Sequence, residues 1–252
     1  MNAQPRRSLL KISMFGISYL KDHNPYMIAW WSAVFPGFGH YLLNQYIRAT
    51  LLTLSEVIIN TLAHINEAMI YSFCGKYELA TSILEPTWAF GYLVIYLYTI
   101  GDSFRIALYQ NKLTHLALKE NKNIPCLAVT AAEIQYLEEK SPFFSAFYSF
   151  FFPGLGQLYN HRFGLAFYAM FWWWIYIWLS KAHEALLTLL LGQLEASNSM
   201  LNPHWFLFMP SVLFGSIYQS YLATMEQNQL FRLEQRTYLS KRYSNSKLRI
   251  FS

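Results

Sequence analysis

Two copies of a Pro-Gly-x-Gly turn constrain the fold of this chain more than any other feature. They begin at Pro36 and Pro153, and each interrupts an apolar, aromatic run. The second copy lies 117 residues after the first, and the same offset, without a gap, pairs other uncommon residues. The pairs include Pro25 with Pro142, Gly75 with Gly192, Pro86-x-Trp88 with Pro203-x-Trp205, and Gln110-Asn111 with Gln227-Asn228. Apolar composition alone does not align such rare residues in one frame, so the pattern predicts an internal duplication.

The composition places the duplicated unit in a membrane. Hydrophobic residues make up 54% of the 252 residues and charged residues only 13%, against about 25% charged in soluble domains. The formal net charge is +5, but the lysines and arginines lie between the apolar segments rather than along one face. This distribution disfavours a nucleic-acid partner and is typical of loops on the cytoplasmic side of a membrane.

Each predicted copy begins with a short amphipathic stretch and continues with three apolar helices. We expect a short helix over 26–35 and 143–152, a long helix over 47–74 and 163–191, and another from 86 to 110 and from 203 to 227 that continues as a polar extension. The chain then divides into a basic, amphipathic N-terminal segment 1–16, membrane repeat 17–122, linker 123–133, membrane repeat 134–239 and basic tail 240–252. Pro210 should kink the last helix, because proline removes a backbone donor.

The short helix before each Pro-Gly turn is too short to cross a membrane. Ten residues reach roughly 15 Å, about half the hydrocarbon core. We therefore expect a re-entrant half-helix that returns at a structural turn, whose residues are Pro36, Gly37, Gly39, Pro153, Gly154, Gly156 and Gln157. With this topology 17 of the 19 lysines and arginines share one side, and only Lys76 and Lys181 lie outside. The alternative, in which the short helix crosses, would invert the repeats and move the linker cations outside.

The N-terminal segment predicts an amphipathic helix on the bilayer surface. Leu9, Ile12, Phe15, Tyr19 and Leu20 fall on one side of such a helix. The matching stretch of the second copy starts with Thr130-Ala-Ala-Glu133, the pattern of a capping box. The two cysteines, Cys74 and Cys126, fall on opposite sides of the membrane in this topology, so we expect no disulfide between them.

Four polar residues in the first long helix form a candidate intramembrane site. Glu56, Asn60, His64 and Glu67 are spaced 4, 4 and 3 residues apart, which places them on one helical face. An ionisable residue within a span is a functional hypothesis by default, and Glu56 is the deepest candidate for a proton or cation site. The competing interpretation is structural, with Glu56 hydrogen-bonded inside the bundle. Asp102 and Arg105, which can pair with each other or with Arg48, favour a local anchor.

The second turn carries a resemblance to a known family. Pro153-Gly154-x-Gly156-Gln157-x-Tyr159-Asn160, followed by Gly164 and an apolar helix, resembles the two-transmembrane-helix hairpin domain of small bacterial membrane proteins. The resemblance covers only the turn and the helices that flank it. The first copy departs from this pattern at three positions. His40 stands in place of Gln157, Leu42 in place of Tyr159 and Ile47 in place of Gly164. The resemblance implies a bacterial membrane protein and little about activity.

The sequence therefore predicts an all-α polytopic membrane protein with two tandem parallel repeats, each with one re-entrant half-helix and two transmembrane helices. No HExxH, G-x-S-x-G or phosphate-loop motif is present, so we expect neither an enzyme nor a cofactor. The first functional hypothesis is a scaffold or accessory subunit that binds a membrane or cytoplasmic protein. The alternative is a small transporter or channel with its site between the repeats near Glu56. A homo-oligomer stays open under both hypotheses.

Overall fold

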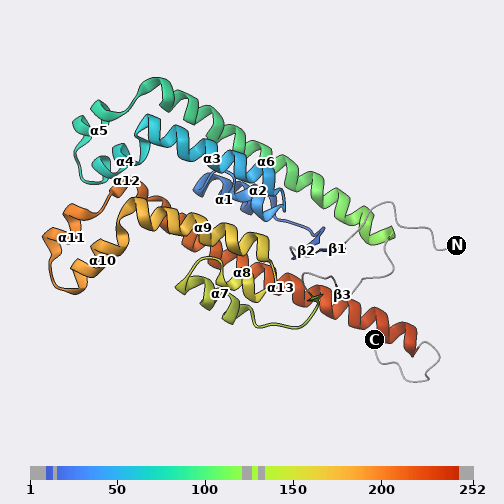
Figure 1. Cartoon of the computed structure of the whole chain (residues 1–252). Helices are drawn as coiled ribbons and strands as arrows, with labels where there is room; N and C mark the ends of the chain where they lie inside the picture. Colours follow the sequence, from blue (N-terminus) through green and yellow to red (C-terminus); the bar gives the residue numbers. More distant parts are fainter. Residues whose placement is uncertain (1–9, 14–15, 121–126, 130–133, 244–252) are drawn as a thin grey trace.

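The computed structural model describes residues 10–13, 16–120, 127–129 and 134–243. The fold is predominantly helical, as expected, and consists of two elongated helical halves that lie side by side (Figure 1). The capping-box residues 130–133, Cys126 and most of the basic tail lie outside the described residues. Cys74 is a free, exposed cysteine.

Within the described residues, the first half contains six helices, the first of them short and the last very long. These are α1 (Pro25–Val34), α2 (Phe38–Leu42), α3 (Tyr46–Ala63), α4 (Ile65–Phe73), α5 (Tyr77–Ile83) and α6 (Pro86–Glu120). Asn24 caps α1 by accepting a hydrogen bond from the Tyr26 backbone N–H, and Pro25 occupies the first turn, where its missing donor has no effect. Both α1 and α3 pack against α6.

The second half contains the same succession of elements. These are α7 (Pro142–Phe151), α8 (Leu155–Tyr159), α9 (Phe163–Ser180), α10 (Ala182–Leu190), α11 (Leu194–Met200), α12 (Pro203–Phe206) and α13 (Phe208–Arg242). Each helix from α7 to α12 begins 117 residues after its counterpart from α1 to α6. The second half differs by an interruption at Leu207 that separates α12 from α13. Pro210 explains it, because its ring leaves no room for the Phe206 carbonyl in a regular helix.

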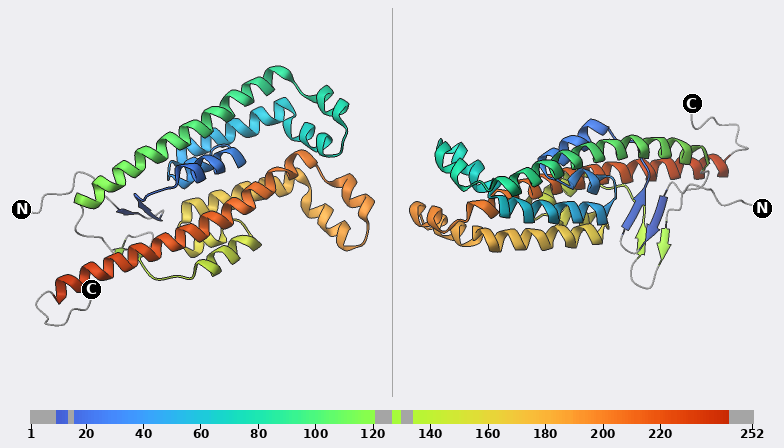
Figure 2. Two further views of the ribbon diagram at one scale, coloured as in Figure 1. Left: turned by 180° about the vertical axis from the view of Figure 1, so that it is seen from behind. Right: turned by 90° about the horizontal axis from the view of Figure 1, so that it is seen from above.

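The predicted amphipathic surface helices are wrong. Residues Leu10–Ser13 (β1) and Gly16–Tyr19 (β2) form an antiparallel hairpin, and Leu127–Val129 (β3) pairs with Ile134–Tyr136 (β4) in the same way. The first hairpin joins residues on both sides of the boundary placed at residue 16. A second view shows the two hairpins together at one end of the helices (Figure 2). Two short segments can hydrogen-bond their backbone N–H and C=O groups to each other as a hairpin. The amphipathic pattern of one segment taken alone does not show that such a partner segment is near.

The long second helix of each copy is also not continuous, contrary to expectation. His64 breaks the first into α3 and α4 with a φ of 56°, and Lys181 breaks the second into α9 and α10 with a φ of 55°. Such left-handed residues end a helix because the next N–H can no longer reach the expected carbonyl. After each break, two short helices pack against each other, α4 with α5 and α10 with α11. Of these, α4 and α10 lie within the predicted long helices, whereas α5 and α11 lie between predicted helices, where no helix was expected.

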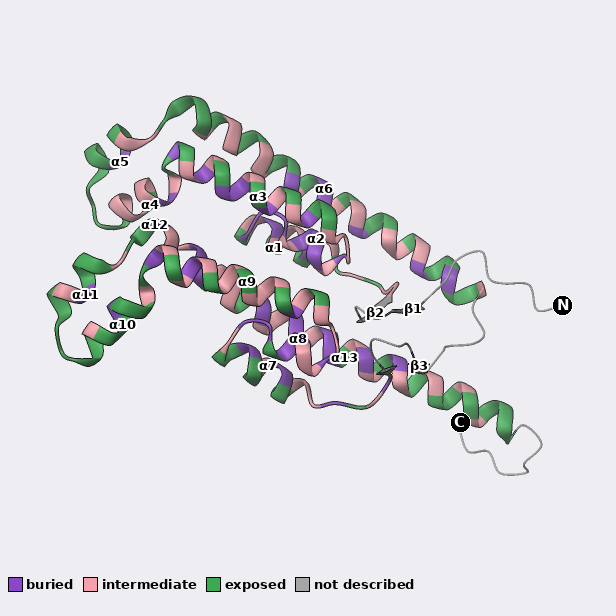
Figure 3. Cartoon of the chain, viewed as in Figure 1, coloured by how far each residue is buried: buried purple, intermediate pink, exposed green. Residues whose placement is uncertain are grey.

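The longest helices have the dimensions and surface of membrane spans. Within the described residues, α9 and the α12–α13 unit are long and apolar enough to cross a membrane, and the bent pair α5–α6 raises the number to three. Their outward faces are exposed over much of their length (Figure 3). Large apolar side chains lie on these faces, among them Phe90, Leu97, Phe167, Trp174 and Trp178. A soluble monomer rarely exposes such continuous apolar surface, whereas lipid accommodates it.

A small aromatic core joins the two halves. Phe35 and Val57 of the first half pack with Tyr176, Phe208 and Met209 of the second. The ring of Tyr176 stacks on that of Phe208 with centroids 5.4 Å apart. Polar contacts reinforce this interface, since the Arg162 guanidinium donates to the Asn44 side chain over 2.7 Å. The halves therefore form a common interior in which sites built from both can exist.

Candidate functional site

The glycines of the two Pro-Gly-x-Gly turns permit close packing that no other residue allows. Gly37 and Gly154 have φ angles of 94° and 106°, in the left-handed region that favours glycine. At Gly39 and Gly156 the requirement is steric instead, because neighbouring atoms leave no room for a side chain. A Cβ at Gly156 would lie 2.2 Å from the Ser145 backbone oxygen. These glycines belong to the predicted structural turns, and Pro36 and Pro153 precede them just after the ends of α1 and α7.

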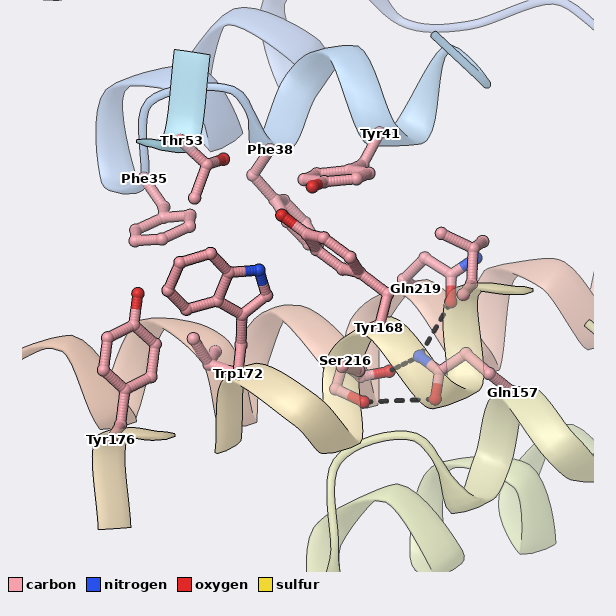
Figure 4. Close-up of a pocket in the computed structure, with 13 residues that line it drawn as sticks. Phe35, Phe38, Tyr41, Thr53, Gln157, Tyr168, Trp172, Tyr176, Ser216 and Gln219 are labelled. Atoms are coloured by element: carbon pink, nitrogen blue, oxygen red, sulfur yellow. Dashed lines mark hydrogen bonds between the residues drawn. The ribbon is translucent and has the colours of Figure 1, made fainter. Parts of the chain in front are cut away.

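A buried polar pair ties each turn to the long helix of its own half. In the second half, the Gln157 side-chain amide donates to the side chain of Gln219 over 2.8 Å and to the Ser216 backbone oxygen over 3.0 Å (Figure 4). In the first half the equivalent residues are His40 and Asp102, whose Nε2 and Oδ2 atoms lie 3.2 Å apart. Both pairs are buried. His40, one of the positions at which the first copy departs from the hairpin resemblance, therefore makes a substitute polar contact.

The first-half pair also carries charge. Arg105 donates to Asp102 over 2.7 Å, and the Arg48 guanidinium lies 3.1 Å from the same carboxylate. The Asp102 side chain is 1% exposed, whereas those of Arg48 and Arg105 are 44% and 75% exposed. Exposed arginines contribute little on their own, so the buried contact with His40 dominates the anchor. The interpretation of Asp102 and Arg105 as a local anchor agrees with this geometry.

Two asparagines explain the repeated Gln-Asn pair. The Asn111 side chain accepts from the His23 backbone N–H and donates to the His23 carbonyl, both over 2.8 Å. Asn228 makes the same two contacts with the backbone of Lys140, over 2.9 and 2.7 Å. Each asparagine side chain thus hydrogen-bonds the backbone N–H and C=O of one residue, as a neighbouring β-strand would. This residue belongs to the segment that leads into the short helix, α1 or α7. The sequence identifies these asparagines by the 117-residue offset but does not reveal their contacts.

The predicted intramembrane site divides into two separate parts. Glu56 is buried, and its Oε1 accepts from Asn60 over 3.1 Å and from the Tyr92 hydroxyl over 3.4 Å. His64 and Glu67 instead form a 3.2 Å pair in which both side chains are substantially exposed. The break at His64 turns the chain away from the helical face, so the four residues do not form one site.

The Glu56 network extends to the second half through residues that the sequence pattern missed. Asn60 exchanges hydrogen bonds with Asn66 beyond the helix break, and the Asn66 amide donates to the His204 backbone oxygen over 3.0 Å. The His204 ring lies 3.1 Å from the Thr61 hydroxyl. The residue spacing within one helix could not predict that Asn66, Tyr92 and His204 join this network, because they lie on other helices. These hydrogen bonds connect α3, the residues after the break at His64 and the start of α12. The network therefore fixes the position of the helix break relative to the second half.

One carboxylate oxygen in this network has no partner. Glu56 Oε2 is buried, and no described side chain or backbone group hydrogen-bonds to it. An unsatisfied acceptor at such a position costs free energy and is uncommon in a purely structural network. The atom is therefore a candidate for binding a proton or a cation.

A wide groove lies between α6 and α13 near their C-terminal ends, which we call the inter-helix groove. It has a volume of about 500 Å³ and is lined by residues 19–24 together with α6 and α13 side chains such as Leu118 and Leu233. Glu226 reaches across it to contact Lys21 and the Tyr19 hydroxyl. The groove thus combines apolar walls with a charged pair, and both halves contribute to it.

Burial in this groove affects His23. Desolvation, with a smaller contribution from the Lys21 charge, lowers the pKa of His23 to about 3. Between pH 6.5 and 3 the unfolded chain binds a proton that the folded chain does not, so stability falls as the pH falls through this window. We expect the midpoint of thermal unfolding in detergent to decrease between pH 7 and pH 4, and to decrease less in His23→Gln.

The matched control for this prediction is His183→Gln, because His183 is exposed on α10. It should retain the full acid-induced decrease. An equal decrease in the wild-type protein and in His23→Gln would contradict the assignment of this effect to His23.

Comparison of the chain with protein-family models, with curated proteins and with solved structures gives no match. In the part of the chain that the structure describes, no group of three or more His, Cys, Asp or Glu side chains could hold a metal ion. The site must therefore be interpreted from its own geometry.

Proposed function

We propose that this chain is a duplicated, four-crossing membrane protein with both ends in the cytoplasm. The spans would be α3, α6, α9 and the α12–α13 unit, with α1 and α7 as re-entrant half-helices. The constant 117-residue offset of the helix starts supports the duplication. The ten-residue length of α1 and α7 and the positive charge gathered on one side support the re-entrant topology.

Cysteine accessibility in intact cells tests this topology. In a background without Cys74 and Cys126, single cysteines at Ser82 and Ser199 should react with a membrane-impermeant maleimide added outside. A cysteine at Asn121 should react only after the cells are opened. Labelling of position 121 from outside, with the amino end inside the cell, would overturn the re-entrant model.

We propose a scaffold or accessory subunit as the function that the geometry supports best. The observation that carries this proposal is the inter-helix groove, which both halves build at the end of the molecule where α6 and α13 extend as polar helices. Its apolar walls and the Lys21–Glu226 pair suit an amphipathic segment of a membrane or cytoplasmic protein. The buried amides near the turns, in contrast, are occupied by internal hydrogen bonds.

Site-specific photo-crosslinking tests this proposal. A photoreactive amino acid at Leu118 or Leu233, which line the groove, should give a discrete adduct with another protein in living cells. Leu116 is a matched control, because it is similarly exposed on α6 but does not line the groove. Adducts that are equal at Leu116 and Leu118, or absent at both groove positions, would contradict a partner in the groove.

The unpartnered oxygen of Glu56 favours a second function, transport of a proton or cation between the halves. Glu56→Gln is a sharp test, because the glutamine oxygen can still accept from Asn60 and Tyr92 while the charge is removed. In proteoliposomes we expect ion flux in the wild-type protein and its loss in Glu56→Gln, with unfolding temperature retained. Absence of flux in the wild-type protein would leave the scaffold as the function.

A further inference from the structure

A cavity lies between the two halves, apart from the Glu56 network and from the inter-helix groove. It has a volume of about 70 Å³, and its walls come from Phe35, α2 and α3 on one side and from α8, α9 and α13 on the other. Figure 4 shows the rings of Phe35 and Phe38 facing Tyr168, Trp172 and Tyr176 across it. The walls are almost entirely carbon, so the cavity favours an apolar occupant over water.

Three buried hydrogen-bond donors border this cavity, and no group within the described residues hydrogen-bonds to any of them. They are the indole N–H of Trp172 and the hydroxyls of Tyr168 and Tyr176. Tyr176 is fully buried. An indole N–H can only donate, so its partner must be an acceptor. Unpaired buried donors are costly and uncommon in folded proteins, so the presence of three beside one cavity is informative.

We propose that this cavity binds an apolar molecule that carries a carbonyl oxygen and enters from the bilayer. A volume of about 70 Å³ accommodates the carbonyl group and the few carbon atoms beside it, so the rest of the molecule would extend out of the cavity. Trp172, Tyr176 or Tyr168 would donate to the oxygen. Apolar pockets with a few well-placed polar groups are the usual form of small-molecule sites. Two membrane sources share this chemistry, the ester group of a phospholipid and the ring of a benzoquinone.

Binding measurements on the purified full-length protein in detergent test the proposal and separate the two sources. One titration uses a benzoquinone with a decyl chain, and the other uses dioctanoyl phosphatidylglycerol, both followed by isothermal titration calorimetry. We expect saturable one-to-one binding of one of the two compounds. Loss of a single donor, in Trp172→Phe or Tyr176→Phe, should weaken this binding about three- to tenfold while the rings remain.

Two further variants make the result specific to the cavity. Ala169→Leu adds three carbon atoms to a residue of the cavity wall and should abolish binding without lowering the unfolding temperature. Trp174→Phe alters an exposed tryptophan that does not line the cavity, so its affinity should equal that of the wild-type protein. The proposal is overturned if neither compound binds one-to-one, or if Ala169→Leu and Trp172→Phe bind as tightly as the wild-type protein.

Discussion

Gly156→Ala is expected to prevent normal accumulation of the folded protein, the largest effect that we anticipate from a single methyl group. The added Cβ would lie 2.2 Å from the Ser145 backbone oxygen and 2.3 Å from the Ser149 hydroxyl. Because one of these neighbours is backbone, α7 and the turn would have to separate, at a cost of about 3 kcal/mol, the upper end of the usual range for overpacking. Monodisperse yield in detergent and the midpoint of thermal unfolding measure the loss.

Gly91→Ala is the matched control for this substitution. Gly91 lies within α6, and a Cβ placed there meets no atom within 4 Å. Alanine is the better helix former by about 1 kcal/mol, so this variant should be as stable as the wild-type protein or more so. If Gly156→Ala folds as well as Gly91→Ala, the close packing of the turn against α7 is wrong.

Asp102→Leu is expected to be the second most damaging change, and the second half of the chain suggests its rescue. The substitution leaves His40 buried without its partner and removes the anion that Arg48 and Arg105 share. Removing one member of a buried ion pair typically costs about 3–5 kcal/mol, and we expect the lower end of that range because both arginines can turn to solvent.

The double variant His40→Gln, Asp102→Gln installs the neutral pair that Gln157 and Gln219 form in the second half. We expect it to recover most of the stability lost in Asp102→Leu, as measured by thermal unfolding. Asp22→Asn, at an exposed aspartate, should have little effect. A double variant no more stable than Asp102→Leu would show that the two halves do not use equivalent contacts at this position.

Local sequence chemistry determined the positions of most helices. Pro86 and Pro203 start helices in the structure as predicted, because proline fits the first helical turn. The short helices start at Pro25 and Pro142, one residue before the predicted positions. The Pro-Gly turns end α1 and α7 where the sequence places them. These features depend on residues that are neighbours along the chain, so one sequence is enough to identify them.

Long-range packing decided the composition of the candidate site. Asn60 and Glu56 lie one turn apart and come together as predicted, but Asn66 and His204 join them only because the chain breaks at His64 and the halves dock. A non-glycine residue in the left-handed region has no reliable local signal, so the helix break was not predicted from the sequence.

The sequence by itself thus determined most of the apolar helices, the prolines and glycines that interrupt them, and the 117-residue offset at which rare residues recur. Only the tertiary structure decided which buried polar groups meet, such as His40 with Asp102, and which stay unpaired, such as Trp172 and Tyr176. The physical reason is that helix formation depends on nearby residues, whereas hydrogen-bond partners between helices depend on how the whole chain packs.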